Sequence, residues 1–281
     1  MRQQKRCLFI DSQCTKLDRA GVPTGVCSVY NPTDQEETII CPNRLYYKGY
    51  EVLRDVVADA FGRDCDLIHP DDLGRMQHDG KKVVGLGKRF GKEIRLPLPR
   101  SPGKKRKAFF YTDWILVQIT STGQLGKFVG VEVQSIDTTG NYQAAQRGYM
   151  KGERNPPPSE HGLNWENVNK RILPQIIFKG RVLQREDLCE RGLYFLVPDP
   201  VYKRIIARLG GDLEEYPSGR GSVTFLLYDL VKSAFAGQHR EVHQVGIKRS
   251  NVESIADRFT SARDLPPAGA FERHIREALG L

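Results

Sequence analysis

The sequence predicts an α/β or α+β protein in which helices flank a mixed central sheet. Strand-like and helix-like segments are interleaved along the chain, and this order points to those two classes. The chain has 281 residues, of which 39% are apolar and 27% are charged. That composition is ordinary for a soluble globular protein, and the length allows a sizeable buried core.

The N-terminal part is the least regular. Residues 1–42 show little periodicity and hold four of the six cysteines, so we treat them as one segment and residues 43–281 as a second, larger domain. The larger domain opens with a predicted helix over Arg44–Phe61. Its apolar residues fall mainly on one face, and Gly62 suits the end of a helix.

Predicted strands follow this helix. Val83–Leu86 and Glu93–Leu96 are short, and the loop PLPRSPGKKRK leads into the apolar run Ala108–Ile119. The turn STGQLG separates that run from a strong strand over Lys127–Ile136. Asn141–Met150 predicts a short helix, and the three prolines of ERNPPPSEHG mark an exposed break. Helices and strands are mixed in the remaining segments, which are Trp165–Leu173, Gly192–Val197, Val201–Leu209, Val223–Leu230, Glu241–Ile247 and Val252–Phe259.

The charge balance indicates the class of partner. Lysine and arginine exceed aspartate and glutamate by 43 to 34, which gives a net charge of +9. This excess favours a polyanion, DNA or RNA before a membrane. The N-terminal MRQQKRCLFIDSQC lacks the apolar core of a signal peptide, and no apolar run approaches membrane-spanning length. We therefore expect a cytoplasmic protein without membrane contact, in which cysteines are metal ligands or spectators and not disulfides.

Two carboxylates are expected to meet in the middle of the chain. In KFVGVEVQSI, strand alternation places Glu132 and Gln134 on one face together with Gly130, which is expected to leave room beside them, and three valines on the other. If the preceding run pairs with this strand, Asp113 lies near Glu132. Such a pair is an oxygen-ligand site for Mg²⁺, which phosphodiester hydrolysis requires. The residues alone also allow a second interpretation, in which Asp113 ends a strand and Glu132 and Gln134 form a solvated strand face.

The whole segment resembles a known family. DWILVQI followed by GVEVQSIDTTGNY is similar to the catalytic hairpin of the NotI-type restriction endonucleases, members of the PD-(D/E)xK nuclease superfamily. The resemblance implies that Asp113 and Glu132 bind the metal and that Gln134 is the third catalytic residue, where most members of the superfamily have lysine. Thr112 stands where the superfamily signature has proline. Glu93 in GKEIRLP is our candidate for an upstream acidic residue, with a surface glutamate as the alternative.

The cysteines predict a second metal site. Cys7, Cys14, Cys27 and Cys41 lie within 35 residues, and four thiolates can form a tetrahedral site for Zn²⁺ or iron. Four unrelated reduced cysteines are the alternative. The family resemblance extends to this segment, through CSVYNP and IICPNRLYY, and it implies an iron-binding module beside the nuclease core. Cys65 and Cys189 stand alone and are expected to be buried small apolar residues.

Basic residues near the predicted hairpin are candidates for contacts with phosphate. They are Lys104, Lys105, Arg106 and Lys107 before it and Arg147 and Lys151 after it. A solvated charge cluster is the alternative for the first four.

These observations predict a type II restriction endonuclease. It would hydrolyse double-stranded DNA with Mg²⁺ at a short palindrome, which the family resemblance suggests is GC-rich, and it would act as a homodimer, because two-fold protein symmetry matches two-fold site symmetry. Two alternatives are a repair or mobile-element nuclease of relaxed specificity and a non-catalytic, metal-stabilised DNA-binding regulator.

Overall fold

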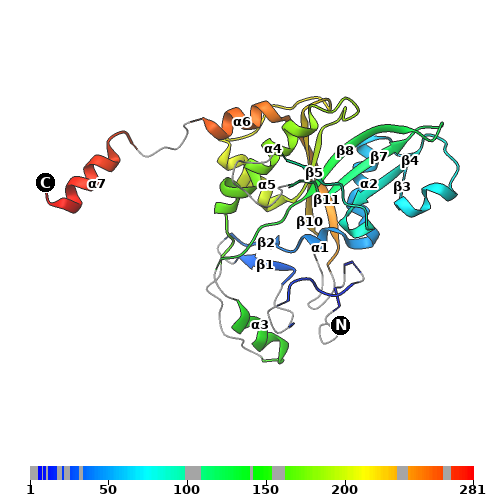
Figure 1. The fold of residues 1–281 in the computed structure, drawn as a ribbon. Coiled ribbons are helices and arrows are strands. Elements are labelled where there is room, and N and C mark those ends of the chain that lie inside the picture. Colours follow the sequence, from blue (N-terminus) through cyan, green and yellow to red (C-terminus); the bar gives the residue numbers. More distant parts are fainter. Residues whose placement is uncertain are drawn as a thin grey trace.

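The computed structural model shows an α/β protein built around a mixed sheet (Figure 1). It describes residues 6–7, 9–10, 12–17, 21, 26–31, 34–98, 109–139, 142–153, 162–232, 240–261 and 267–281, without the side chains of residues 143, 149 and 150. The strands are β1 (Ser28–Asn31), β2 (Glu36–Ile39), β3 (Asp66–Ile68), β4 (Lys82–Gly87), β5 (Leu96–Pro97), β6 (Phe109–Phe110), β7 (Trp114–Ile119), β8 (Leu125–Val133), β9 (Leu193–Pro198), β10 (Ser222–Leu230) and β11 (Val242–Asn251). The helices are α1 (Pro42–Leu45), α2 (Tyr47–Ala60), α3 (Gln143–Met150), α4 (Leu173–Leu183), α5 (Asp199–Arg208), α6 (Val252–Thr260) and α7 (Ala270–Leu279).

Within the described residues, seven strands form the central sheet in the order β11-β10-β9-β8-β7-β4-β3. β8, β9 and β10 are parallel to one another, and so are β3 and β4. β7 runs antiparallel to both β4 and β8, and β11 runs antiparallel to β10. The predicted class, with a mixed sheet flanked by helices, is confirmed.

Helices cover both faces of this sheet. The first core cluster joins α4, α5 and α6 to one face through residues such as Ile176, Ile205 and Ile255, all fully buried. The second joins α2 to the opposite face through Leu53 and Val56. Because both faces are covered, the central strand β9 (LYFLVP) is buried along its whole length and has no polar alternation.

The predicted helix over Arg44–Phe61 is correct in its buried face but not in its continuity. The chain adopts left-handed φ angles at Lys48 (53°), Gly49 (64°) and Tyr50 (68°). This conformation is costly for a residue with a side chain, and tertiary contacts must stabilise it. The ring of Tyr50 supplies such contacts, since it packs edge-on against Phe90 and Trp114, with ring centroids 5.2 and 5.6 Å apart.

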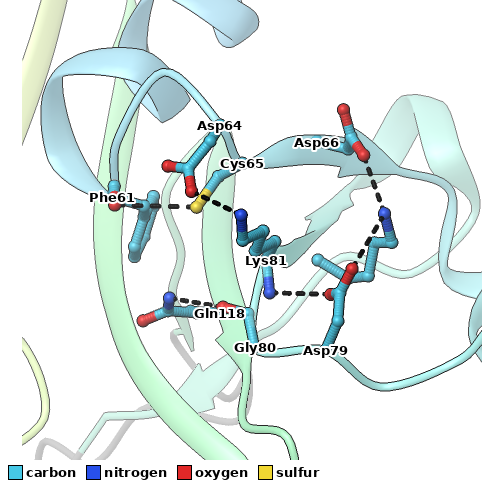
Figure 2. A network of polar contacts seen from close by, with 9 residues as sticks. Phe61, Asp64, Cys65, Asp66, Asp79, Gly80, Lys81 and Gln118 are labelled. Atoms are coloured by element: carbon cyan, nitrogen blue, oxygen red, sulfur yellow. Dashed lines mark hydrogen bonds and ion pairs between the residues drawn. The ribbon is translucent and has the colours of Figure 1, made fainter.

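A network of ion pairs and hydrogen bonds connects the edge strand β3 to the segment before β4 (Figure 2). The Nζ atom of Lys82 lies 2.7 Å from Oδ2 of Asp66 and 3.6 Å from Oδ2 of Asp79, and Lys81 pairs with Asp64 at 2.9 Å. These pairs are exposed on at least one side, so each contributes little free energy. Together they connect β3 to the loop before β4, next to the partly buried Cys65.

The N-terminal hairpin of β1 and β2 packs onto the same body. Ile39 and Ile40, at its end, are 1% and 2% exposed and belong to the clusters on the two sides of the sheet. Lys203 of α5 pairs with Glu36 at 3.1 Å, and Arg240 pairs with Glu37. By contrast, α7 lies apart from the sheet (Figure 1), with exposed apolar side chains. None of the described helices is both long and apolar enough to cross a membrane.

Candidate active site

The sheet register brings Asp113 and Glu132 together. Trp114, the first residue of β7, is paired with Val131 of β8, so Asp113 stands opposite Glu132. The backbone N–H of Asp113 donates to Oε1 of Glu132 at 3.1 Å, and the N–H of Val133 donates to Oδ2 of Asp113 at 2.9 Å. Each carboxylate is thus held by the backbone of the neighbouring segment. The predicted convergence of the two side chains is confirmed.

Trp114 fixes the start of β7 and, with it, the position of Asp113. Its side chain is 1% exposed, and its indole Nε1–H donates to the hydroxyl of Tyr46 at 3.0 Å. A buried indole that has satisfied its hydrogen bond is a rigid anchor. The residue beside Asp113 therefore cannot shift without breaking core contacts.

The side chains of β8 alternate between the two faces of the sheet, as predicted. The three valines enter the core against α2, whereas Glu132 faces α4 and is 5% exposed. The expected role of Gly130 is wrong in one respect. A Cβ at this position would lie 2.4 Å from Cδ1 of Leu183, so α4 occupies the space that we expected to be free beside the polar residues.

Lys179 is the residue that the sequence reasoning missed. Its Nζ lies 2.5 Å from Oε1 of Glu132, and the two side chains are 12% and 7% exposed. Lys179 follows Glu132 by 47 residues and lies on α4, outside any hairpin motif. One signal was available: Lys179 comes three residues after Ile176 and four before Leu183, on the side of α4 that its apolar spacing turns inward. A lysine there has to find a buried partner.

The site opens into a cavity of about 460 Å³. β6, β8, α4 and the N-terminal segment all contribute to its wall. The lining residues are Lys16, Pro42, Phe109, Phe110, Tyr111, Asp113, Glu132, Val133, Gln134, Ser135, Asp137, Arg171, Gln175, Phe178 and Lys179. The cavity is therefore lined by carboxylates and cations, with aromatic rings among them.

Gln134 follows β8 and lines this cavity, as the alternation predicted. Its backbone N–H donates to the carbonyl of Leu196 at 2.9 Å and prolongs the sheet by one residue. Its side-chain amide Nε2 donates to the carbonyl of Ser135 at 2.5 Å. An amide cannot accept a proton near neutral pH, so Gln134 can orient a ligand but cannot act as a base.

The two carboxylates are electrostatically strained. Burial, and then the charge of Asp113, raises the pKa of Glu132 to about 7, while the ammonium of Lys179 lowers it. Burial likewise raises the pKa of Asp113. The ammonium of Lys179 does not offset the effect of burial on Glu132 and on the half-buried Asp113, so an added divalent cation would relieve the repulsion between the two carboxylates. Carboxylate and amide oxygens are also the donors that Mg²⁺ prefers, although among the described residues Asp113 and Glu132 have no third His, Cys, Asp or Glu side chain arranged with them to hold a metal ion.

Glu93 lies within electrostatic range of the pair but outside the cavity wall. Its charge raises the pKa of Asp113, and its side chain, 15% exposed, forms an ion pair with Arg95. Arg89 acts in the opposite direction on Asp113 and lowers its pKa. Glu93 as a further acidic residue of the site stays a prediction.

Only some of the residues predicted to contact phosphate lie in the described part of the chain. Lys104, Lys105, Arg106 and Lys107 lie outside the described residues. Arg147 and Lys151, in and just after α3, are exposed and do not line the cavity. Among the described residues, the cations that line it besides Lys179 are Lys16 and Arg171, and Arg171 pairs with Asp137 at 3.0 Å.

The four N-terminal cysteines share one electrostatic environment. Burial raises the pKa of the Cys27 thiol to about 11, and the charges of Cys41, Cys7 and Cys14 add to this. Burial also raises the pKa of Cys41, with contributions from Cys7 and Cys14. Within the part of the chain that the structure describes, however, no three His, Cys, Asp or Glu side chains are arranged to hold a metal ion. The thiols are gathered in one region without forming a closed ligand set.

Comparison of the sequence with models of known protein families gives no match, and comparison with curated protein sequences gives none either.

Proposed function

We propose that this protein is a Mg²⁺-dependent endonuclease that hydrolyses double-stranded DNA at a short specific site, as type II restriction endonucleases do. The observation that carries the proposal is the arrangement of the buried Glu132 with the half-buried Asp113 and Lys179 on the wall of one cavity. The net charge of +9 supports a polyanionic substrate. The resemblance of the β7–β8 hairpin to NotI-type enzymes supports the reaction class.

The roles of the residues follow from their chemistry. Asp113 and Glu132 would hold the metal, which when bound supplies Lewis-acid polarisation of the phosphate and a lower pKa for the attacking water. Lys179, the ion-pair partner of Glu132, would present its ammonium to the negative charge that develops on the phosphate. Gln134 would orient the water or the phosphate through its amide. The buried position of Glu132 excludes bulk water from this pair.

A plasmid-cleavage assay tests the proposal. The wild-type chain with Mg²⁺ should give discrete bands, and Asp113→Ala and Glu132→Ala should each abolish cutting while DNA binding persists. Asp229→Ala, a strand carboxylate of β10 outside the cavity, is the matched control and should cut normally. A smear would favour the nuclease of relaxed specificity. Failure of the wild type to cut would favour the non-catalytic regulator.

We also propose that the enzyme is a cytoplasmic homodimer acting on a palindrome, GC-rich by the family resemblance. One active site must reach each strand, and a two-fold dimer provides this. Sedimentation should then give about 64 kDa, twice the chain mass of 31.8 kDa. A monomer both free and on cleavable DNA would contradict the dimer and leave the hydrolytic site untouched.

For the cysteines, we propose one structural iron held by Cys7, Cys14, Cys27 and Cys41, with zinc as the alternative. The raised pKa values of Cys27 and Cys41 support this, because the charges of neighbouring thiols contribute to both after burial, and a cation bound among them would remove that repulsion. Four thiolates suit either metal in a tetrahedral site.

A further inference from the structure

Aromatic rings are exposed around the mouth of the active-site cavity. The side chains of Phe109, Tyr111 and Phe178 are 44%, 50% and 50% exposed, and all three line the cavity that contains Asp113 and Glu132. Single exposed apolar residues are common on protein surfaces. Three rings around one polar cavity form a patch, and such a patch indicates a ligand with an apolar face.

The rings are supported from behind. Phe110, between two of them in sequence, is 7% exposed and packs edge-on against Phe178, with centroids 5.7 Å apart. Phe109 belongs to the short β5–β6 ladder, where it is paired with Pro97. The Nζ of Lys179 lies 5.6 Å from the centre of the Tyr111 ring. The aromatic rim, as we call Phe109, Tyr111 and Phe178, therefore lies on the segment just before Asp113 and on α4, which carries Lys179.

The neighbours of the aromatic rim define the ligand. Lys16, Arg171 and Lys179 line the same cavity, so a group placed against the rings has cations beside it. A nucleotide presents this combination, since the flat face of its base can stack on an aromatic ring while its phosphate meets lysine and arginine. A protein segment with apolar side chains would gain nothing from the carboxylate pair at the bottom of the cavity.

We propose that the aromatic rim stacks against an unpaired base of the substrate strand, adjacent to the phosphate that is cut. The inference rests on the proposed nuclease function and adds to it. Bases within a duplex already stack on one another, so a base can reach the rings only after local unstacking. The enzyme would thus bind single strands through their bases and would distort a duplex at the cleavage site.

Binding to short oligonucleotides in EDTA tests the aromatic rim without any cleavage. The probes are an oligothymidylate and an abasic strand of equal length, which carries the same phosphates and no bases. Wild-type protein should prefer the strand with bases. Tyr111→Ala and Phe178→Ala should each reduce that preference by about ten-fold, which lies within the range for stacking of one base on one aromatic ring. Affinity for the abasic strand should hardly change.

Matched controls separate stacking from loss of any exposed ring. Tyr30 on β1 is 59% exposed and Phe271 on α7 is 82% exposed, and neither lines the cavity. Tyr30→Ala and Phe271→Ala should keep the full preference for bases. Circular dichroism should show that all four variants are folded.

The outcomes distinguish this inference from the function on which it rests. A base preference that persists in Tyr111→Ala and Phe178→Ala, in a protein that cleaves plasmid, would overturn the stacking site and leave the nuclease intact. A base preference that these variants lose, in a protein that never cleaves, would retain a base-binding site and overturn the nuclease. Equal affinity of the wild type for both strands would also overturn the stacking site, and the aromatic rim would then be assigned to a protein partner.

Discussion

The carboxylate site and the four-cysteine segment are held in different ways. Asp113 and Glu132 are fixed by the register of β7 on β8 and by reciprocal bonds from backbone N–H groups. The cysteines lie in a segment that contains the four-residue strands β1 and β2, and the charges of neighbouring thiols add to the effect of burial in raising the pKa of Cys27 and Cys41. One site is organised by the sheet before any ligand arrives. In the four-cysteine segment the thiols lie near one another, but among the described residues they do not form a ligand set, which a bound metal would have to complete.

Replacement of Lys179 is the most direct test of the carboxylate site. Lys179→Met should lower the cleavage rate by roughly 100-fold or more, as removal of one preorganised charge does in other active sites. Lys179→Arg should restore part of the activity. Arg181→Met removes a charge from the same helix, where Arg181 pairs with Glu253 away from the cavity, and should cut normally. Single-turnover cleavage measures all three, and equal rates for Lys179→Met and Arg181→Met would refute the role of Lys179.

Variants of Gln134 test whether the amide that follows β8 or the ammonium of Lys179 on α4 contributes more to cleavage. Gln134→Ala should reduce cleavage while leaving the fold intact, and Gln134→Glu should be partly tolerated, since a carboxylate can still face the metal and the water. We expect a smaller loss for Gln134→Ala than for Lys179→Met, because Gln134 carries no charge. The reverse order in the same single-turnover assay would mean that the amide, and not the ammonium, is the third catalytic group.

Removal of one thiol tests metal binding by the four-cysteine segment. Cys14→Ser should lose the bound iron or zinc, about one per chain in the wild type by elemental analysis, and should lower the melting temperature. Cys65→Ser is the control, because Cys65 lies in the polar network of Figure 2 and not among the four thiols. Full metal content in all four single cysteine variants would end the hypothesis of a common site.

The strain in the carboxylate pair should appear as a pH dependence of stability. The pKa of Glu132 in the folded protein, about 7, exceeds its ordinary value of 4.5, so the folded state prefers the protonated form. The resulting stabilisation is present below pH 4.5 and is lost as the pH rises to about 7. Without metal, this group should cost on the order of 2 kcal/mol of unfolding free energy between pH 5 and pH 8.

Urea unfolding in EDTA measures this effect. Glu132→Gln should remove the corresponding part of the pH slope, and Mg²⁺ should stabilise the wild type more at pH 8 than at pH 5, because it binds the ionised form. An identical slope in wild type and Glu132→Gln would show that the carboxylate is not under this strain.

The smallest expected effect concerns the contact between β8 and α4. Gly130→Ala places a methyl group against Leu183, which should cost about 1–3 kcal/mol by overpacking and push α4 with Lys179 away from Glu132. Stability and cleavage should then fall together. Gly74→Ala is the control, since a Cβ there has no neighbour within 4 Å. Thermal unfolding and cleavage of the two variants, compared side by side, decide whether the close approach of α4 matters for catalysis.

Features that depend on near neighbours in the chain could be predicted from the sequence. Alternation in β8 placed Glu132 and the valines on opposite faces, and a turn of a few residues brought Asp113 opposite Glu132. Both follow from the geometry of a strand, in which every second side chain shares a face. The apolar periodicity of α2 likewise identified its buried side, although not the left-handed turn that tertiary contacts of Tyr50 stabilise.

Which distant residues share the cavity follows from the tertiary packing and could not be predicted from the sequence. Lys179 reaches Glu132 because α4 crosses the sheet where Gly130 allows close packing, and no local pattern encodes that crossing. The aromatic rim combines Phe109 and Tyr111 from one part of the chain with Phe178 from another, and their exposure is a property of the folded surface. Local geometry fixes the direction in which a side chain points, whereas the packing of helices on the sheet determines what it meets there.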